Sequence, residues 1–278
     1  MRPQYPVSSE SASRQHFAYT AQHSQPAPFA MGNAAAKLVE AAEAGCLEEV
    51  AKAIKNGQSL DKTFNDRTPL MGAASNGHVE VVQLLLDHEA DVHAADHLHR
   101  TALAHAAGQG HLQVALVLLE HGADVEGSPD TTATPLVEAA LGGHTKVVQL
   151  LLNNNAVVDL DAETPQVSTA LSVTAFQSTT DTARVLLDHG ALVDALDSTG
   201  NTALMRAAQQ GNRKLVKLLL ERNADGSTRN PGGETAVGFA KAHGEDEIVA
   251  MLLEHQRKKK AWNLYNPADD TWMTAVTA

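Results

Sequence analysis

Residues 66–96 read DRTPLMGAASNGHVEVVQLLLDHEADVHAAD, and this stretch decides the fold. Thr68 can cap a helix through its hydroxyl, and Pro69 suits the first helical position because no backbone hydrogen bond is lost there. Gly77 supplies the left-handed residue that ends this first helix. A second, mostly buried helix is indicated by six apolar residues, Val79, Val81, Val82, Leu84, Leu85 and Leu86. The stretch therefore predicts two helices that turn back on each other, followed by an extended segment.

The same pattern recurs along the chain. Thr-Pro-Leu or Thr-Ala-Leu is followed by a pair of small residues, by Gly-His and by Leu-Leu, in that order. The small pair lets a second helix approach closely. The first residue of each motif is a threonine: Thr68, Thr101, Thr134, Thr169, Thr202 and Thr235, with spacings of 33, 33, 35, 33 and 33 residues. A fixed period of this length indicates a stacked array of repeats.

This unit resembles the ankyrin repeat, which has the same period and the same motifs. The resemblance implies an all-α solenoid of helix–turn–helix pairs with β-hairpin fingers, and about seven repeats including two capping repeats. We expect three regions: a disordered tail over 1–32, an ankyrin repeat domain over 33–255, and a basic, aromatic tail over 256–278. The first helix pair, 34–61, has a polar outer helix, as an end repeat requires.

The fifth unit departs from the pattern. Its threonine comes two residues late because the preceding finger, 159–168, is longer, and Ser178-Thr179 replaces Gly-His. Loss of that glycine should reshape the end of the inner helix. A second irregularity is Glu89, which ends an outer helix where the other units have Gly or Asn, residues that tolerate a left-handed backbone.

Composition and charge exclude several classes of protein. The chain has a net charge of -12, and because residues 1–32 contribute +1 and residues 256–278 contribute +2, the repeat region carries -15. Such a surface repels phosphates, so we expect no direct nucleic-acid binding. No run of about 18 apolar residues predicts a membrane span. A single cysteine, Cys46, interpreted as a small buried filler, permits no internal disulfide and favours the cytoplasm.

The C-terminal region carries a basic run, Arg257 to Lys260, and both tryptophans, Trp262 and Trp272. The run has two interpretations. It is either a nuclear import signal, which would add a nuclear location, or a set of cations placed favourably beyond the end of a helix.

Neither the histidines nor any catalytic motif in the sequence indicates an enzyme. No Gly-rich phosphate loop and no GxSxG motif occurs, so we predict no catalytic residues and no cofactor. His78, His111 and His144 recur every 33 residues, and the resemblance implies that they join neighbouring repeats through backbone hydrogen bonds. Three further histidines, His93, His97 and His99, cluster in one finger, but we predict no metal site there.

The resemblance also implies a concave face, formed by fingers and inner helices, that binds a protein segment. Leu98, Leu141 and Phe176 are apolar residues predicted to be exposed on that face, which indicates contact with a partner. The full set of partner-binding candidates is Leu98, Arg100, His105, Gln109, Glu138, Leu141, Phe176, Gln177, Arg206 and Gln209. We therefore expect a monomeric, non-enzymatic scaffold or adaptor for a protein partner. The alternative is a regulatory subunit that inhibits or targets an enzyme, with the C-terminal tail as a docking peptide.

Overall fold

A computed structural model describes residues 34–129, 131, 133–159, 169–177 and 180–265, with side chains to residue 261. The chain divides into two units, Met1–Asn33 and Ala34–Ala278, and the repeats lie in the second. The predicted N-terminal tail, most of the long finger, Ser178, Thr179 and Trp272 fall outside the described residues.

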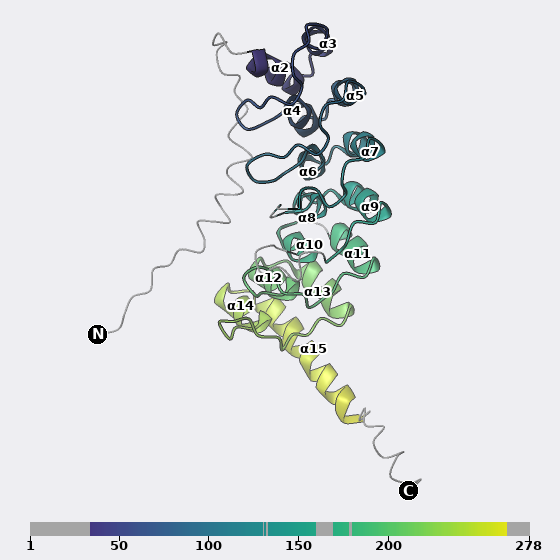
Figure 1. Ribbon diagram of the computed structural model, residues 1–278. Coiled ribbons are helices and arrows are strands. Elements are labelled where there is room, and N and C mark those ends of the chain that lie inside the picture. Colours follow the sequence, from purple (N-terminus) through teal and green to yellow (C-terminus); the bar gives the residue numbers. More distant parts are fainter. Residues whose placement is uncertain (1–33, 130, 132, 160–168, 178–179, 266–278) are drawn as a thin grey trace, which may run out of the picture. The chain divides into compact units, whose positions relative to one another are not determined.

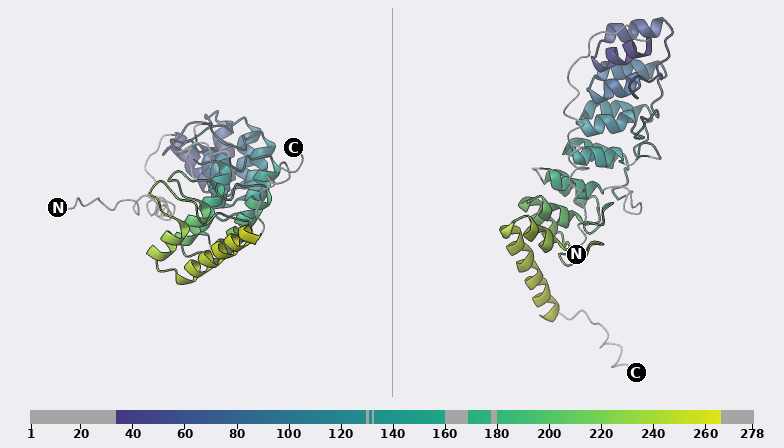
Figure 2. Two further views of the ribbon diagram at one scale, coloured as in Figure 1. Left: turned by 90° about the horizontal axis from the view of Figure 1, so that it is seen from below. Right: turned by 90° about the vertical axis from the view of Figure 1, so that its left-hand side faces the viewer.

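The described residues form seven helix pairs stacked one on another (Figure 1). Figure 2 shows the same stack from two further sides. The inner helices are α2 (Ala34–Glu43), α4 (Pro69–Ser75), α6 (Ala102–Gln109), α8 (Pro135–Leu141), α10 (Ala170–Val173) with the 3-10 turn η2 (Thr174–Phe176), α12 (Ala203–Gln209) and α14 (Ala236–Ala242). The outer helices are α3 (Leu47–Lys55), α5 (Val79–Asp87), α7 (Leu112–Glu120), α9 (Thr145–Asn153), α11 (Asp181–Asp188), α13 (Arg213–Glu221) and α15 (Asp246–Tyr265). This arrangement confirms the predicted all-α solenoid of seven units.

The core runs along the array as a series of small layers. Each inner helix packs against the inner helices of the units before and after it, and the outer helices α3, α5, α7 and α9 pack in the same order. In each of the second to sixth units one leucine fills the space between them and is almost fully buried: Leu70, Leu103, Leu136, Leu171 and Leu204. Because each pair covers its apolar side only by contact with its neighbours, the stack needs no central core.

The threonines that begin each motif, here called the landmark threonines, cap the starts of the inner helices. Thr68 accepts a hydrogen bond from the backbone N–H of Met71 at 3.2 Å, and the other five threonines cap their helices in the same way at 3.1–3.4 Å. Each cap satisfies a backbone donor that would otherwise have no partner within the helix. The predicted role of these threonines is confirmed.

The fingers contain little regular strand structure. Within the described residues they form isolated β-bridges, Phe64 with Arg67, Ala95 with Thr101 and Leu196 with Thr202. Two buried aspartates hold the finger turns instead. Asp96 Oδ1 accepts backbone N–H groups at 2.9 Å, and Asp197 Oδ1 does so at 2.9 and 3.0 Å. An aspartate that bonds the backbone two residues on is a recognised turn device.

The structure corrects two interpretations of the sequence. Cys46 is exposed at the position before α3, so it is not a buried filler. The last helix, α15, runs to Tyr265. The basic run Arg257 to Lys260 therefore lies within this helix and not beyond its end.

Two expected irregularities are present. In the fifth unit the inner helix is only four residues long and tightens into η2, whereas α6 has eight residues. Glu89 has a left-handed backbone with φ of 63°, as do Asn155 and Asn223 at the same position in other units. Glu89 adopts this conformation without the tolerance of glycine or asparagine, so its backbone is strained.

Candidate protein-interaction face

Histidines join neighbouring units and fix where the inner helices end. The Nε2 atom of His78 lies 2.9 Å from the carbonyl oxygen of Glu43 in the unit before it. His111 and His144 make the same bond to Ser75 and Gly108, at 3.1 and 3.0 Å. The predicted role of these three histidines is confirmed, and since the carbonyl can only accept, Nε2 carries the proton.

Each of these imidazoles rests on a glycine of the preceding unit. A methyl group at Gly77 would lie 2.6 Å from Nδ1 of His111, and Gly77 has φ of 77°. Glycine is therefore required at this position for two reasons, space for the ring and a left-handed backbone.

Amide side chains take over this role around the fifth unit. Gln177 Nε2 donates a hydrogen bond to the carbonyl of Leu141, and Asn212 Nδ2 donates to the carbonyl of Gln177 at 2.8 Å. Gln177, a partner-binding candidate, is thus also a structural link between units. It is half-buried, and the rest of its amide remains available for a further bond.

His105 does not reach the predicted face. Its side chain is 5% exposed, and its Nε2 lies 3.0 Å from Oδ2 of Asp96. Arg100 donates to the same carboxylate oxygen from Nε at 3.0 Å. The imidazole points back towards the finger, where it forms a hydrogen bond with Asp96. His105 is therefore not accessible to a partner.

The environment of this cluster sets its charges. Burial alone would raise the pKa of Asp96, but hydrogen bonds from the His105 ring and the Arg100 backbone, with the Arg100 charge, outweigh it and hold that pKa well below the ordinary value. Burial lowers the pKa of His105; the Asp96 hydrogen bond opposes this, and the positive charge of Arg100 adds to it. His105 is therefore neutral at neutral pH and donates from Nε2 to an ionised carboxylate.

The sixth unit repeats this arrangement with an arginine. Arg206 donates from Nε to Asp197 Oδ2 and from Nη2 to Thr199 Oγ1, both at 2.6 Å, and from Nη1 to Gln209 Oε1 at 3.3 Å. Burial of Asp197 opposes ionisation, but the Arg206 hydrogen bond and those of Thr199 and Asn201 lower its pKa. The Arg206 side chain is only 21% exposed, and its main role is to hold the finger in place through Asp197.

The sequence reasoning missed the two aspartates. Asp96, Asp197 and also Asn230 stand five residues before a landmark threonine, and each accepts backbone hydrogen bonds in its finger. That recurring offset is the signal that could have revealed them.

The remaining candidates lie where successive inner helices end. Gln109 ends α6, Leu141 ends α8, Phe176 ends η2 and Gln209 ends α12. Phe176 is 38% exposed, Gln109 is exposed, and Leu141 and Gln209 are partly exposed. Glu138, also partly exposed, lies one turn before Leu141, with its carboxylate over Gly108. Leu98, 37% exposed, lies apart in the finger of the third unit.

Six exposed large apolar residues of the described part of the chain were not predicted, and three of them lie outside the helices. Val157 is 50% exposed and Leu192 is 59% exposed, at a position where other units have Asp91, Asp124 and Asp225. Leu196, in the next finger, is 46% exposed. An alignment of the units with one another would have revealed Val157 and Leu192, since each replaces an aspartate that other units carry at this position.

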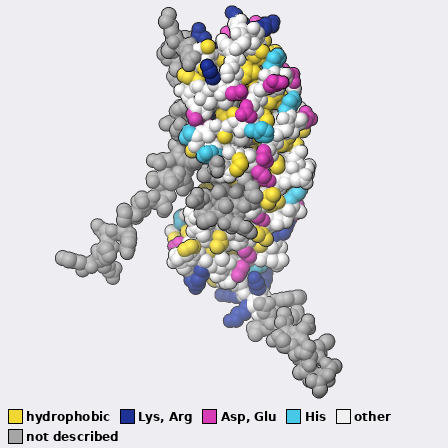
Figure 3. Space-filling model, in the orientation of Figure 1, with side chains coloured by type: hydrophobic (Ala, Val, Ile, Leu, Met, Phe, Trp, Pro, Cys, Tyr) yellow, Lys and Arg dark blue, Asp and Glu magenta, His cyan; other side chains and the backbone are white. Residues whose placement is uncertain are grey.

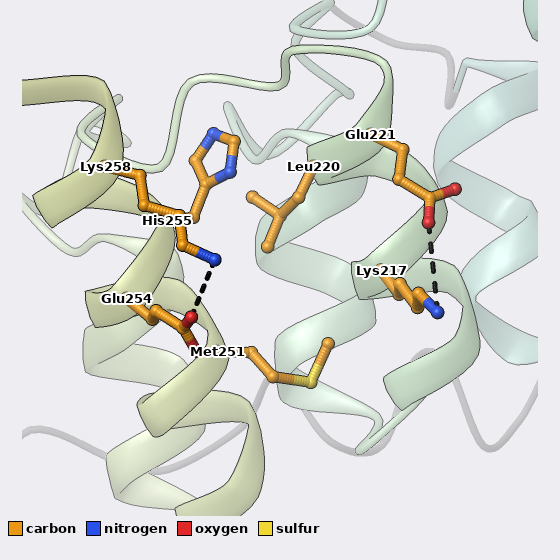
Figure 4. Close-up of a pocket in the computed structure, with 7 residues that line it drawn as sticks. All are labelled: Lys217, Leu220, Glu221, Met251, Glu254, His255 and Lys258. Carbon is orange, nitrogen blue, oxygen red and sulfur yellow. Dashed lines mark ion pairs between the residues drawn. The ribbon is translucent and has the colours of Figure 1, made fainter. Parts of the chain in front are cut away.

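Two of the hollows on the described surface adjoin helices of the array. One, of about 470 Å³, adjoins the row of inner-helix ends and is lined by Phe176, Gln177, Gln210 and Lys214, among others. The other, of about 320 Å³, lies between the outer helices α13 and α15, where Leu220 faces Met251 (Figure 4). The cations around this second hollow are engaged, Lys217 with Glu221 at 4.0 Å and Lys258 with Glu254 at 2.7 Å. Because the second hollow lies between outer helices, only the first of the two adjoins the candidate face.

The described surface offers no cluster suited to a metal ion. No group of three or more side chains that could hold one lies together in the part of the chain that the structure describes. Within the same residues, no helix is both long enough and apolar enough to cross a membrane.

Comparison with known proteins agrees with this geometry. A family model for ankyrin repeats matches three times, over residues 38–128, 136–230 and 191–263. The ankyrin repeat domain of human ASB11 is 30% identical with a TM-score of 0.69, and the match covers 77% of this chain and 96% of that one. The ankyrin repeat domain of Bcl-3, described as a unique member of the IkappaB protein family, is 27% identical with a TM-score of 0.63, and the match covers 78% and 97%.

One curated protein matches over a short segment. The ankyrin repeat and KH domain-containing protein mask of Drosophila melanogaster is 52% identical over 48 residues, which are 17% of this chain and 1% of that protein. The matched segment is too small a part of that protein to carry over its activity. The family model, in contrast, spans most of the array, and the chain belongs to the ankyrin repeat family.

Proposed function

We propose that the chain is a non-enzymatic adaptor that binds a protein segment on the face formed by its fingers and inner-helix ends. Ankyrin repeats generally mediate protein–protein interaction, and they are typically without enzymatic activity of their own. The observation that carries the finer proposal is the pair Leu141 and Phe176, which stand at the ends of inner helices in consecutive units. Phe176 also lines a hollow of about 470 Å³.

A bound segment would gain most at these two side chains. Apolar groups that are partly exposed in the free protein and covered in the complex contribute about 25 cal/mol per Å² of buried area. Aromatic residues near the centre of an interface often contribute most of its binding energy. The cap of Thr134 on α8 holds Leu141 in place, so little ordering of this side chain is needed when the partner binds.

The test is affinity capture with a matched control. The double variant Leu141→Ala/Phe176→Ala should lose a partner that the wild type captures. The control, Leu112→Ala/Leu253→Ala, removes apolar groups that are 37% and 36% exposed on outer helices, similar to Phe176 at 38%, and should keep that partner. Retention of the partner by the first variant, or its equal loss from both, contradicts the proposed face.

A second candidate is a regulatory subunit that docks through its C-terminal tail. It is favoured by one observation: Arg257 to Ala261 are all exposed on α15, in a part of the helix that extends beyond the predicted repeat domain. Removal of residues 266–278, together with replacement of the four cations by alanine, separates the two. An adaptor that uses the inner face keeps its partner after these changes, whereas a tail-docked subunit loses it.

A further inference from the structure

We infer that the partner segment at this face is extended, carries no net charge, and offers two apolar side chains about three residues apart. This inference rests on the proposed function and specifies the chemistry of the segment that binds. It is carried by the row of residues that follows the pair of small residues in the second to sixth units, here called the inner row: Ser75-Asn76, Gly108-Gln109, Leu141-Gly142, Phe176-Gln177 and Gln209-Gln210.

The inner row is free of charge although the repeat region carries -15. None of its ten residues is ionisable, whereas the outer helices and loops hold most of the acidic groups. Figure 3 shows the acidic side chains along the array and the Lys and Arg side chains mainly near its two ends. A charged partner segment would be desolvated here without an opposite charge to meet it, which costs free energy.

The arginines near the inner row are already occupied, and the other charged side chains beside it, Glu138 on α8 and Lys214 at the hollow, are opposite in sign. Arg100 lies 2.9 Å from Asp96, and its side chain is 25% exposed. Arg206 lies 2.6 Å from Asp197. Removing either arginine from its buried aspartate would leave an uncompensated charge, so neither is free to pair with a partner's carboxylate.

Side-chain amides make up most of the polar part of the inner row. Asn76, Gln109 and Gln210 are exposed, and Gln209 is partly exposed. An amide both donates and accepts, as a peptide backbone does. An extended segment presents its backbone N–H and C=O groups to such amides, whereas a helix uses most of its own internally. The row therefore fits an extended segment better than a helical one.

The spacing of the units sets the spacing of the partner's side chains. Packed helices lie about 8–10 Å apart. An extended chain in the polyproline II conformation advances about 3.1 Å per residue with three residues per turn, so its residues i and i+3 face the same side. One unit thus corresponds to about three residues of the partner. Leu141 and Phe176 occupy neighbouring units, so the apolar side chains that contact them should stand at positions i and i+3. The whole row, four steps long, matches a segment of about 12 residues.

The experiment selects from a random library of 12-residue peptides on the full chain and then measures binding of the selected peptides. The expected peptides have apolar side chains at i and i+3 and a net charge near zero. Their Kd should change by less than about 2-fold between 50 and 500 mM NaCl, because no charge pairs form. The variant Gln109→Ala/Gln210→Ala should weaken binding several-fold by removing amide partners, and Leu112→Ala should leave it unchanged.

The outcomes separate this inference from the proposed function. Selected peptides that are strongly basic or acidic, and whose Kd rises more than about 10-fold over that salt range, overturn the inference while binding still depends on Leu141 and Phe176. Peptides that bind equally well to the Leu141→Ala/Phe176→Ala variant contradict the proposed function itself. A helical bound peptide, seen by circular dichroism or isotope-edited NMR, overturns the extended geometry alone.

Discussion

The third and fifth units are built from the same motif but differ at the end of the inner helix. In the third unit α6 is followed by Gly110 with φ of 78°, and the His144 ring of the next unit rests against that glycine. In the fifth unit α10 shortens into η2, and Gln177 provides the link to the unit before it. The regular end supports the stack, whereas the irregular end leaves Phe176 38% exposed. Repetition thus identifies structural residues, and departures from it identify candidates for function.

The largest expected effect concerns the regular end. Gly77→Ala should destabilise the array by about 3 kcal/mol, because it combines a left-handed strain with a methyl group that displaces His111 from its hydrogen bond. Gly122→Ala is the matched control: its φ is 82°, and no atom lies within 4 Å of the added methyl group. It should cost only about 1 kcal/mol. If urea denaturation shows the same loss of unfolding free energy for both variants, the contact between the added methyl group and the His111 ring does not destabilise the array.

The next prediction compares the two units directly. Amides in α10 and η2 should exchange with solvent at least about 10-fold faster than those in α6 and α8, because a short helix with a 3-10 end offers fewer protecting bonds. Native-state hydrogen exchange of the free protein measures this. Uniform protection across the four elements would mean that the irregular end is as stable as the regular one.

A smaller effect is expected at the end of α5. Glu89→Gly should stabilise the protein by roughly 1 kcal/mol, because it relieves a left-handed backbone with φ of 63°. Asn155→Gly, at the same position with φ of 66°, should gain only a few tenths of that, since asparagine tolerates this conformation. A lower melting temperature for Glu89→Gly would refute the strain argument.

The smallest effect depends on pH. Because burial holds the pKa of His105 below the ordinary value of 6.5, the neutral ring contributes its full stability above about pH 6.5, and this contribution is lost as the pH falls through the folded pKa. A glutamine side chain does not titrate in this range, so His105→Gln should lose less stability than the wild type between pH 7 and 5. Urea denaturation at each pH measures the difference. A parallel loss in both proteins would mean that His105 does not contribute to acid sensitivity.

Much of the fold could be predicted because each structural rule is local and repeated. The threonine caps, the buried leucines and the interlocking histidines follow from residue type and spacing, and all three were confirmed. The prediction was wrong where the role of a residue depends on the direction of its side chain. His105 was expected on the face but bends to Asp96, and spacing alone cannot show this.

The candidate site was predictable in position but not in chemistry. Gln109 and Phe176 were expected on the partner-binding face, and both are exposed. Their near neighbours Arg100 and Arg206 were expected to meet the partner, yet both bind buried aspartates. That difference depends on three-dimensional contacts between finger and helix, which a sequence pattern does not contain.

The most direct test of the central claim is hydrogen exchange of the full chain with and without a bound partner segment. We expect new protection at the C-terminal ends of α8, η2 and α12, with outer helices α9, α11 and α13 unchanged. Protection confined to the outer helices or to the exposed part of α15, with none along the inner row, would contradict it.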